Sequence, residues 1–563
     1  MLSNDQYSDF VIIGGVAAGT KAASVLARRM PKATITLFER SEHISYASCG
    51  LPYFASGDIG TFKELLLTPY GVERDTAFFR DVKGFAVHTN VEAVAIDRPA
   101  KNVTLRLKGQ NHLVRHRYGK LVLATGGLPI HPPFPIPDID TVSCFTRPED
   151  AIKFRTMAES GKIESAVIIG GGLIGCELAE AVGGLWGIQT TLIEKADRLL
   201  PAMLDSEMAA IVERELVRKK VKVIKGANVN GVFNHDGRPS VSIEGGDKID
   251  ADYLFLALGI RPNVALASDA GLALGKSGAV MVDKRLRTSD PDIYAGGDCV
   301  ESVHMITGEP CHLPMGSLAN KHGRIIAENL AGGFAENPPV LGNMVVKVFD
   351  LSAGAVGLTY DKAVVTGFNP ESVWGSFVDK PDYYPDKKSF VLKMIYSKTD
   401  DRLLGLQAAG DGDICRRLDV FSALLQKRST VEDLLDFEHA YAPPFSEALD
   451  PLFQMASLAK AGKRGILTVN PSEIPEDHSE TVLLDVRETA ESSGQPIPET
   501  PRRKIINLPL GILRDANLDI DPAAEIFVIC KRGPRAYQAV HILRKKGFGN
   551  SKIIGGGVQA ALD

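Results

Sequence analysis

Short apolar runs alternate with glycine-rich turns through the first half of the chain. The run DFVII leads into glycines and an alanine-rich stretch, and a second apolar run ends just before Glu39. The run SAVII opens a similar unit, which ends just before Glu194. An apolar run, a glycine turn, a helical pattern and another apolar run are typical of a strand–helix–strand unit. The pattern therefore predicts an α/β fold with two such units.

The first unit has the features of a dinucleotide site. Gly14, Gly15 and Gly19 stand between strand and helix, although Val16 replaces the middle glycine of the G-x-G-x-x-G spacing. Glycines let the backbone approach a pyrophosphate, and the helix N-terminus supplies amide groups. Glu39 can hold a ribose. A plain tight turn is the alternative interpretation.

The second unit has the complete spacing, with Gly170, Gly172 and Gly175 followed by Glu194. A carboxylate at that position accepts hydrogen bonds from ribose hydroxyls and repels a 2′-phosphate. We therefore expect NADH to be preferred over NADPH, a preference that the neighbouring Lys195 weakens. Together the two units predict two Rossmann-like dinucleotide-binding domains.

The end of the chain has a separate α/β pattern, in which the strand EIFVI delivers Cys530 to the start of a helix. Backbone amides, the helix dipole and the cations Lys531, Arg532 and Arg535 can stabilise an anionic sulfur there, such as a persulfide. A packing cysteine at a strand end is the alternative.

Composition narrows the range of partners. Hydrophobic residues make up 44% of the chain and charged residues 24%, as in an ordinary globular protein. The net charge of −5 argues against nucleic acid or an anionic membrane as the main partner. The start, MLSNDQYSDF, lacks a basic apolar signal, and no run of about 18 apolar residues occurs. We expect a cytoplasmic protein with no membrane partner.

The seven cysteines are scattered singly, at positions 49, 144, 176, 299, 311, 415 and 530. Neither a disulfide framework nor a metal site is expected from this spacing. Chemistry must therefore come from single thiols. Cys49, in SYASCGLPYF, is the first candidate.

Two further segments, KLVLATGGLPI and DIYAGGDCV, complete a pattern that resembles the two-dinucleotide flavoprotein disulfide reductase superfamily over about residues 8–450. The resemblance implies that Thr125 and Gly126 lie against FAD and that Asp298 binds its ribityl chain, with a helix N-cap as the alternative role of Asp298. It implies an FAD-binding domain, an NAD-binding domain and an α+β dimerisation domain, over residues 1–120 with 246–334, 121–245 and 335–454 respectively.

Typical members carry two cysteines five positions apart, whereas this chain has Cys49 alone. It thus resembles the single-cysteine branch of NADH oxidases, NADH peroxidases and coenzyme A-disulfide reductases. The oxidases and peroxidases place a histidine where this chain has Ala17. The coenzyme A enzymes use two tyrosines from the partner subunit, which match Tyr383 in PDYYPD and Tyr441 in HAYAPPF, with Tyr384 as a substitute for Tyr383.

A tyrosine hydroxyl can donate a hydrogen bond to a leaving thiolate, although buried interface tyrosines are a simpler interpretation. The resemblance implies a homodimer whose active site is shared between subunits. The coenzyme A enzymes usually read S-F-A-N-C, so SYASC departs at Tyr46 and Ser48. Ser45, Ser48 and Arg28 are candidate contacts to coenzyme A, with Arg28 suited to a phosphate or, alternatively, simply exposed on its helix.

The segment after residue 465 resembles a rhodanese domain, because D-V-R, N-x-P-L and C-x-x-G-x-R occur in the family's order. We expect a linker over 455–470 and a C-terminal rhodanese α/β domain over 471–563.

The combined hypothesis is an FAD- and coenzyme A-dependent NADH persulfide, polysulfide or coenzyme A-disulfide reductase. Hydrosulfide or thiol would leave through a mixed disulfide on Cys49, with Cys530 as sulfur acceptor and donor. Two alternatives stay open: an NADH oxidase or peroxidase that cycles Cys49 sulfenic acid, and a redox-sensing sulfur carrier without turnover.

Overall fold

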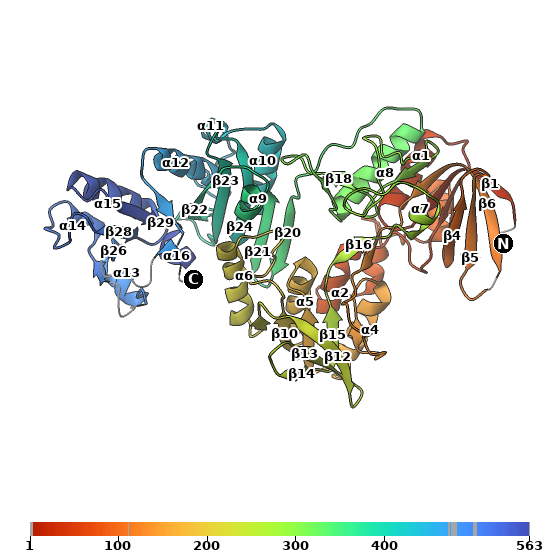
Figure 1. Ribbon diagram of the computed structural model, residues 1–563, viewed down its shortest axis with the longest axis horizontal. Coiled ribbons are helices and arrows are strands. Elements are labelled where there is room, and N and C mark those ends of the chain that lie inside the picture. The colour runs from red at the N-terminus through yellow and green to blue at the C-terminus, as the bar shows by residue number, and fades with distance from the viewer. Residues whose placement is uncertain (1–3, 111, 471–472, 475–480, 499–503, 562–563) are drawn as a thin grey trace. The chain divides into compact units, whose positions relative to one another are not determined.

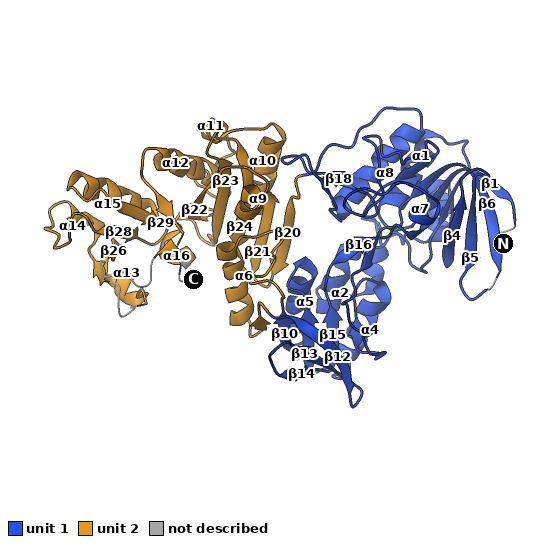
Figure 2. Cartoon of the chain, in the orientation of Figure 1, with its two compact units in different colours: residues 1–193, 227–340 blue, residues 194–226, 341–563 orange. Residues whose placement is uncertain are grey.

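The computed structural model describes residues 4–110, 112–470, 473–474, 481–498 and 504–561. The ends of the expected C-terminal domain, residues 471 and 563, lie outside the described residues. The chain forms two compact units (Figure 2). Unit 1 comprises residues 1–193 and 227–340, and unit 2 comprises residues 194–226 and 341–563.

The first sheet of unit 1 has the strand order β3-β2-β1-β6-β5-β4, with β17 beside β6 (Figure 1). Strands β1, β2, β3, β6 and β17 run parallel, whereas β4 and β5 form an antiparallel ladder with β6. The strands are β1 (Gln6–Ile13), β2 (Ile35–Phe38), β3 (Ala86–His88), β4 (Val91–Asp97), β5 (Asn102–Leu107), β6 (Leu113–Leu123) and β17 (Ile293–Ala295).

Strand β1 lies at the centre of this sheet and buries both faces. Phe10 and Ile12 lie in one core with α1 (Ala18–Arg29) and α8 (Gly316–Leu330). The alternate residues of β1 lie in a second core with β4 and β5. Because parallel strands end at the same edge, the segments after β1, β2, β6 and β17 meet there.

Unit 1 contributes a second parallel sheet in the order β10-β9-β15-β8. Strand β15 belongs to it, so the second nucleotide-binding domain extends past residue 245, the end expected from the sequence. The reason is that β15 is a short, fully buried strand whose pattern lacks polar alternation. The strands and the helices beside them are β8 (Val142–Ser143), α4 (Pro148–Glu159), β9 (Ser165–Ile169), α5 (Leu173–Gly183), β10 (Gln189–Ile193) and β15 (Tyr253–Leu256).

Smaller elements complete unit 1. Strands β12, β13 and β14 form an antiparallel sheet, and β7 pairs with β16 where the chain passes between the two parallel sheets. The bounds are η1 (Ser48–Gly50), α2 (Leu51–Ser56), η2 (Phe62–Leu66), α3 (Thr76–Phe78), η3 (Phe79–Lys83), β7 (Gly127–Pro129), β12 (Val229–His235), β13 (Arg238–Ile243), β14 (Lys248–Asp250), β16 (Ile260–Pro262), α7 (Ala265–Asp269), β18 (Ser302–Val303) and β19 (Pro310–Cys311).

Unit 2 contains an antiparallel sheet in the order β20-β21-β24-β23-β22. Its strands are long and heavily buried, as a sheet covered by helices requires. The elements are α6 (Ser206–Arg218), β11 (Lys222–Ile224), β20 (Met344–Val348), β21 (Leu351–Gly357), α9 (Tyr360–Val365), β22 (Pro370–Val378), β23 (Ser389–Ser397), β24 (Leu403–Gly410), α10 (Cys415–Gln426), α11 (Val431–Leu435) and α12 (Pro451–Lys463).

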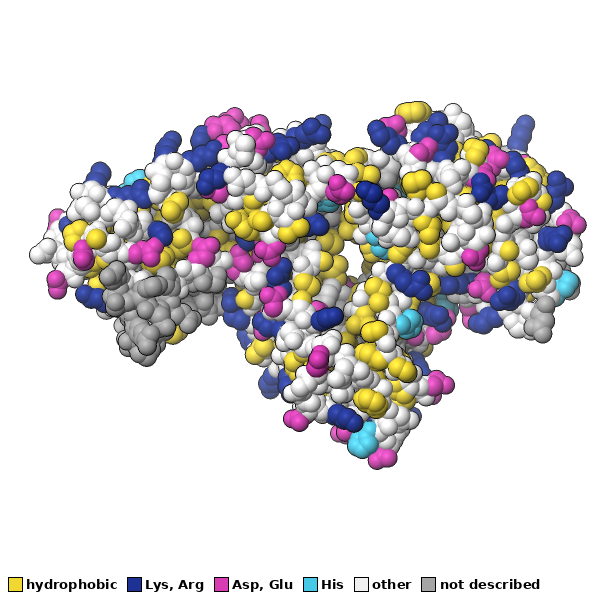
Figure 3. Space-filling model, in the orientation of Figure 1, with side chains coloured by type: hydrophobic (Ala, Val, Ile, Leu, Met, Phe, Trp, Pro, Cys, Tyr) yellow, Lys and Arg dark blue, Asp and Glu magenta, His cyan; other side chains and the backbone are white. Residues whose placement is uncertain are grey.

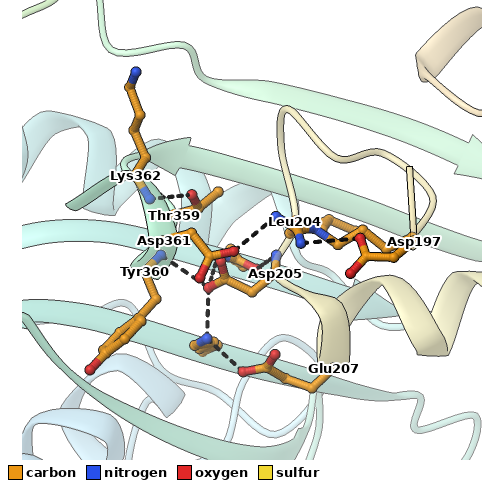
Figure 4. Close-up of polar contacts among 11 residues, drawn as sticks. Asp197, Leu204, Asp205, Glu207, Thr359, Tyr360, Asp361 and Lys362 are labelled. Atoms are coloured by element: carbon orange, nitrogen blue, oxygen red, sulfur yellow. Dashed lines mark hydrogen bonds and ion pairs between the residues drawn. The ribbon is translucent and has the colours of Figure 1, made fainter. Parts of the chain in front are cut away.

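A buried charge network joins α6 to this sheet (Figure 4). Lys393 Nζ of β23 donates to Asp205 at 2.6 Å and to Glu207 at 2.5 Å. Gln407 Nε2 and the Tyr360 backbone N–H donate to the same Asp205 carboxylate. Burial opposes the charge on Lys393, but the two carboxylates outweigh it and raise the pKa of the ammonium group. A buried cation with this many partners fixes the segment before α6 on the sheet.

The C-terminal domain, residues 465–561, is a parallel sheet in the order β25-β29-β28-β26-β27. The expected linker over 455–470 instead forms the end of α12, whose apolar face is buried, and strand β25. The elements are β25 (Thr468–Val469), β26 (Thr481–Asp485), α13 (Thr489–Gly494), β27 (Lys504–Asn507), α14 (Leu510–Leu513), β28 (Glu525–Ile529), α15 (Pro534–Lys545), β29 (Ser551–Ile554) and α16 (Gly557–Ala561).

Acidic and basic side chains are interspersed over the face in Figure 3 rather than gathered into one large patch of a single sign. Among the described residues, no helix combines the length and the apolar character needed to cross a membrane.

Candidate active site

The first glycine turn connects β1 to α1 and brings its predicted residues together. Gly14 adopts a φ of 108°, and a Cβ there would lie 2.1 Å from the Ala124 carbonyl oxygen. A Cβ on Gly19 would lie 1.9 Å from the Gly14 oxygen, so helix and strand touch through their backbones. The Gly15 N–H donates to Glu39 Oε2 at 2.7 Å, which holds the carboxylate beneath the turn.

This arrangement fits an FAD pyrophosphate and ribose. The N-cap residue of α1 is Ala17, whose side chain does not cap the helix, so the amides of the first turn stay available to a phosphate. Glu39 is 7% exposed at the end of β2, where a ribose-binding carboxylate belongs.

The predicted contacts from β6 and β17 lie at the same edge. Thr125 Oγ1 donates to the Asn263 carbonyl at 2.7 Å, and the Asn263 amide donates back to the Thr125 carbonyl. Gly126 follows with a φ of 68°. Asp298 stands after β17, where burial raises the pKa of its carboxyl group.

Sequence reasoning missed His322 of α8, which holds the turn before Asp298. Its Nδ1 accepts a hydrogen bond from the Gly297 N–H at 3.1 Å. Burial lowers the pKa of His322 to about 4, so the ring is neutral and can accept at neutral pH. The local signal was only a histidine on an apolar helix face.

The second glycine turn repeats the geometry of the first. A Cβ on Gly170 would lie 2.3 Å from the Ala257 carbonyl, and one on Gly175 would lie 1.8 Å from the Gly170 oxygen. Gly172 is the N-cap residue of α5, and a Cβ built on it would have no atom within 4 Å. The turn therefore fits a second dinucleotide. Glu194 directly follows β10 in the chain and accepts a hydrogen bond from the Ala196 N–H at 2.7 Å.

Cys49 lies in the exposed segment η1, within unit 1. The residues that lead into η1 are attached to the first glycine turn, because the Ser45 N–H donates to the Gly15 carbonyl oxygen at 2.7 Å. A Cβ built on Gly316, the first residue of α8, would lie 3.7 Å from Cys49 Sγ. The first turn of the long helix α8 therefore lies next to the sulfur.

The expected coenzyme A contacts are accessible. Ser48 is exposed beside Cys49, Ser45 is half-buried, and Arg28 is exposed in the last turn of α1. Tyr46, which replaces the family's phenylalanine, is held in unit 1 with the pKa of its phenol raised to about 12 by burial and by Glu39.

A second feature that the sequence analysis missed is the pair Tyr53 and Glu177. The Tyr53 hydroxyl on α2 donates to Glu177 Oε1 on α5 at 3.4 Å. Burial raises the pKa of Glu177 to about 7, and burial together with Glu177 raises the pKa of Tyr53 to about 12. A carboxyl group that titrates near neutral pH therefore lies on the helix that follows the second glycine turn.

In unit 2 the structure brings Tyr383 and Tyr441 together. A hydrogen bond between the two hydroxyls raises the pKa of Tyr383. Both tyrosines are exposed, at 74% and 49%. Tyr384 instead lies under the Lys380 ammonium, 5.7 Å from its ring centre. This geometry favours Tyr383 over Tyr384 as the partner of Tyr441.

Cys530 lies at the end of β28 and is 1% exposed. The Gly533 N–H donates to Cys530 Sγ at 3.1 Å, and the Val558 N–H donates to the Cys530 carbonyl at 2.9 Å. The turn at Gly557 packs closely against this loop, since a Cβ built there would lie 2.3 Å from the Cys530 carbonyl oxygen. One backbone amide, that of Gly533, therefore contacts the sulfur just before α15, and the Val558 amide holds the cysteine's carbonyl.

The cations of this loop have different partners. Arg535 makes a bidentate contact with the Glu491 carboxylate at 2.5 and 2.9 Å, which lowers the pKa of Glu491 to about 2. Arg532 pairs with Asp382 at 2.5 Å. Lys531 is exposed. The two arginines therefore act through carboxylates rather than standing alone beside the sulfur.

Residues 8–315 match the family described as pyridine nucleotide-disulphide oxidoreductase, and residues 344–452 match the dimerisation domain of that family. The chain therefore belongs to this family and is an FAD-dependent oxidoreductase that uses NAD(H). The expected family, α/β fold class, and FAD and nicotinamide cofactors are confirmed.

The chain is similar over nearly its whole length to the solved NAD-dependent persulfide reductase from A. fulgidus, with 38% identity, a TM-score of 0.93, and coverage of 98% of this chain and 100% of that chain. A reduced Bacillus anthracis protein described as CoADR-RHD is 31% identical, with a TM-score of 0.89 over 100% of this chain and 98% of its own. A Pyrococcus abyssi relative named NAD(P)H sulfur oxidoreductase (CoA-dependent) is 34% identical over 80% of this chain and 98% of its own length.

Proposed function

We propose that the chain is an NADH-dependent reductase of persulfides, polysulfides and coenzyme A disulfide. The observation that carries this proposal is the hydrogen-bonded pair of Tyr383 and Tyr441, together with an exposed Cys49 that has no second cysteine five positions away. The pair offers a phenolic donor to a departing thiolate, which peroxide or oxygen chemistry does not need. The names of the similar proteins, which include persulfide reduction and coenzyme A dependence, agree with this choice.

The first step takes place at Cys49. Its thiolate attacks a coenzyme A persulfide, the sulfur–sulfur bond of the persulfide breaks, hydrosulfide leaves, and a Cys49–coenzyme A disulfide forms. With coenzyme A disulfide as the substrate, coenzyme A thiolate leaves instead. The α8 N-terminus next to Gly316 stabilises the attacking thiolate, and Ser45, Ser48 and Arg28 bind the coenzyme.

The mixed disulfide is then reduced by two electrons and one proton, which yields Cys49 thiolate and free coenzyme A. When bound, FAD supplies the transfer of these electrons from NADH. Its pyrophosphate would be held by the turn Gly14, Gly15 and Gly19 and its ribose by Glu39, with Thr125, Gly126 and Asp298 along the rest of the cofactor. The nicotinamide dinucleotide would bind at Gly170, Gly172 and Gly175, where Glu194 selects NADH.

We further propose a homodimer, because residues 344–452 are a dimerisation domain. In that assembly Tyr383 and Tyr441 serve Cys49 of the partner subunit. This arrangement explains why the two hydroxyls are paired yet widely exposed in a single chain.

The C-terminal domain is proposed to be a rhodanese-like sulfurtransferase. Cys530 accepts a sulfane sulfur as a persulfide and passes it to coenzyme A. In that transfer the bond from Cys530 to the outer sulfur breaks, a coenzyme A–sulfur bond forms, and Cys530 leaves as a thiolate. The buried cradle around Cys530 supports this role, since the backbone N–H of Gly533 already donates to its sulfur.

The test is anaerobic NADH oxidation with coenzyme A persulfide, polysulfide plus coenzyme A, or coenzyme A disulfide, with hydrosulfide release followed. Cys49→Ser is expected to abolish turnover with all three. Cys530→Ser is expected to slow the polysulfide reaction and to spare the other two. Cys415→Ser, at an exposed cysteine elsewhere, is the matched control. Normal turnover by Cys49→Ser would show that the mechanism is wrong.

Oxygen and peroxide distinguish the alternative activity. An oxidase or peroxidase would consume NADH rapidly with either oxidant alone and would trap sulfenic acid on Cys49. We expect slow consumption, because Ala17 stands where that chemistry uses a histidine. A redox-sensing carrier would instead show almost no turnover with any sulfur substrate.

A further inference from the structure

The C-terminal domain is packed directly against the antiparallel sheet of unit 2 through a glycine turn. A Cβ on Gly555 would lie 2.7 Å from Trp374 Cδ1, and one on Gly556 would lie 2.6 Å from Trp374 Nε1 and 3.1 Å from Ser376 Oγ. Trp374 and Ser376 belong to β22 and are buried. The two glycines therefore let the backbone of the turn rest on β22 with no intervening side chain.

The same turn supports the Cys530 loop on its other side. The Val558 N–H donates to the Cys530 carbonyl at 2.9 Å, and the Gln559 N–H donates to the Lys531 carbonyl at 3.2 Å. Contact with β22 and support of the catalytic loop thus come from one continuous piece of backbone. The position of the loop on β22 is consequently set by packing.

A second contact fixes the far side of the loop. Arg532 Nη2 pairs with Asp382 Oδ2 at 2.5 Å, with the arginine side chain 20% exposed and the aspartate 60% exposed. Asp382 directly precedes Tyr383, the tyrosine that hydrogen-bonds to Tyr441. Lys387 Nζ also pairs with Asp382, at 3.0 Å.

The segment that enters the C-terminal domain forms a helix and a strand rather than a mobile hinge. Residues 451–463 form α12, in which Met455, Ala456 and Ala459 are buried, and the chain then enters strand β25. Both the entry helix and the glycine turn hold the domain in one position.

We propose that Asp382 and Arg532 form a positioning pair, which holds the Cys530 loop beside the Tyr383–Tyr441 pair of the same chain. This inference rests on the proposed function. Sulfur then leaves Cys530 at the site to which this chain contributes its tyrosines, and the domain does not swing. The transfer itself needs no oxidant: the Cys530–sulfur bond breaks, the acceptor thiol forms a bond to that sulfur and gives up its proton, and Cys530 leaves as a thiolate.

Three assays separate positioning from chemistry. The first is NADH oxidation driven by polysulfide and coenzyme A, which requires Cys530. The second is NADH oxidation with coenzyme A disulfide, which does not require Cys530. The third is sulfur transfer from polysulfide to cyanide, which reports the chemistry of Cys530 alone.

Asp382→Asn is expected to lower kcat/KM about three- to fivefold in the first assay only, which is the scale of one partly exposed ion pair. Asp382→Arg is expected to lower it about tenfold, because like charges then face each other. The double variant Asp382→Arg with Arg532→Asp should recover most of that loss. Lys387→Gln is the matched control and should stay within about twofold of the parent.

Two readouts separate this role from a general loss of structure. In the parent, added salt should lower the first activity towards that of Asp382→Asn, whereas the variant should respond little. Hydrogen exchange of the backbone amides of residues 531–533 and 535 should increase in Asp382→Asn, with the exchange of β28 unchanged.

The outcomes distinguish the two proposals. If Cys530→Ser slows the first assay and the Asp382 variants do not, the positioning role is wrong and the relay stands. If all three assays fall together in Asp382→Asn, the pair is merely structural and the inference is overturned. If Cys530→Ser leaves the first assay unchanged, the proposed relay itself fails.

Discussion

The two cysteine sites are built in opposite ways. Cys49 is exposed in the short segment η1, next to Gly316 at the start of the long helix α8, and the glycine leaves room around the sulfur. Cys530 is buried, its sulfur accepts a hydrogen bond from the Gly533 N–H, and the arginines of its loop are paired with carboxylates. The comparison shows one cysteine that is open to other groups and one that its own loop encloses, which agrees with the different roles proposed for them.

The glycines beside the two cysteines give the strongest test of this contrast. Gly557→Ala would place a Cβ 2.3 Å from the Cys530 carbonyl at a φ of 63°, so the loop must move. We expect sulfur transfer to cyanide to fall more than about 100-fold, with the stability of the C-terminal domain lowered by about 2 kcal/mol.

At the other cysteine, Gly316→Ala would place its Cβ 3.7 Å from Cys49 Sγ, an ordinary contact. Coenzyme A-disulfide reduction should fall less than tenfold. Gly511→Ala, where nothing lies within 4 Å of the new Cβ, controls for glycine replacement in the C-terminal domain. Equal losses at Gly557 and Gly316 would remove the distinction between an enclosed and an open cysteine.

The tyrosine pair tests whether the open cysteine depends on groups from another part of the assembly. Tyr383→Phe and Tyr441→Phe should each lower kcat for coenzyme A disulfide about 10- to 100-fold, because the leaving thiolate loses its donor. The double variant should be little worse than either single one, since the two hydroxyls act as a unit. Tyr384→Phe should stay within about twofold, and a large loss there would reverse the assignment of the working tyrosine.

The smallest expected effect concerns charge near neutral pH. The pKa of Glu177 in unit 1 is raised to about 7, whereas that of Glu491 beside the Cys530 loop is lowered to about 2. A carboxyl group whose pKa is raised on folding contributes to the stability of the folded state in full below about pH 4.5. That contribution disappears as the pH rises through about 7. Glu177→Gln stays neutral, so its melting temperature relative to the parent should increase between pH 5 and pH 8.

The expected change for Glu177→Gln is about 1 kcal/mol, because the side chain is only partly buried. Thermal unfolding of parent and variant across this pH range measures it, with Glu42→Gln at an exposed position as the control. A difference that does not change with pH would mean that Glu177 does not titrate in this range.

Much of the site could be predicted because its signals are local. The glycine turns, Glu39 and the Cys530 loop each depend on a few consecutive residues and on the strand before them. Family resemblance added Tyr383 and Tyr441, which lie in short motifs far apart in the chain.

Other features depend on tertiary pairing and left no local signal. Tyr53 and Glu177 are 124 positions apart, and Asp382 and Arg532 are 150 apart. Nothing within a few residues of either partner predicts the pairing, which appears only when the fold brings the two together. The expected linker was wrong for a related reason. Its polar and glycine residues suggest a loop, whereas its apolar residues form one face of a helix that is buried when it packs in the fold.

The packing of the glycine turn on β22 also affects self-association. Strand β22 lies at the end of its sheet, where a strand offers unpaired backbone groups to any other chain. The C-terminal domain places β25 and α16 next to this strand and covers Trp374. The domain therefore shields Trp374 and part of β22 from solvent, so a chain without it would present an apolar surface on this strand that could drive self-association.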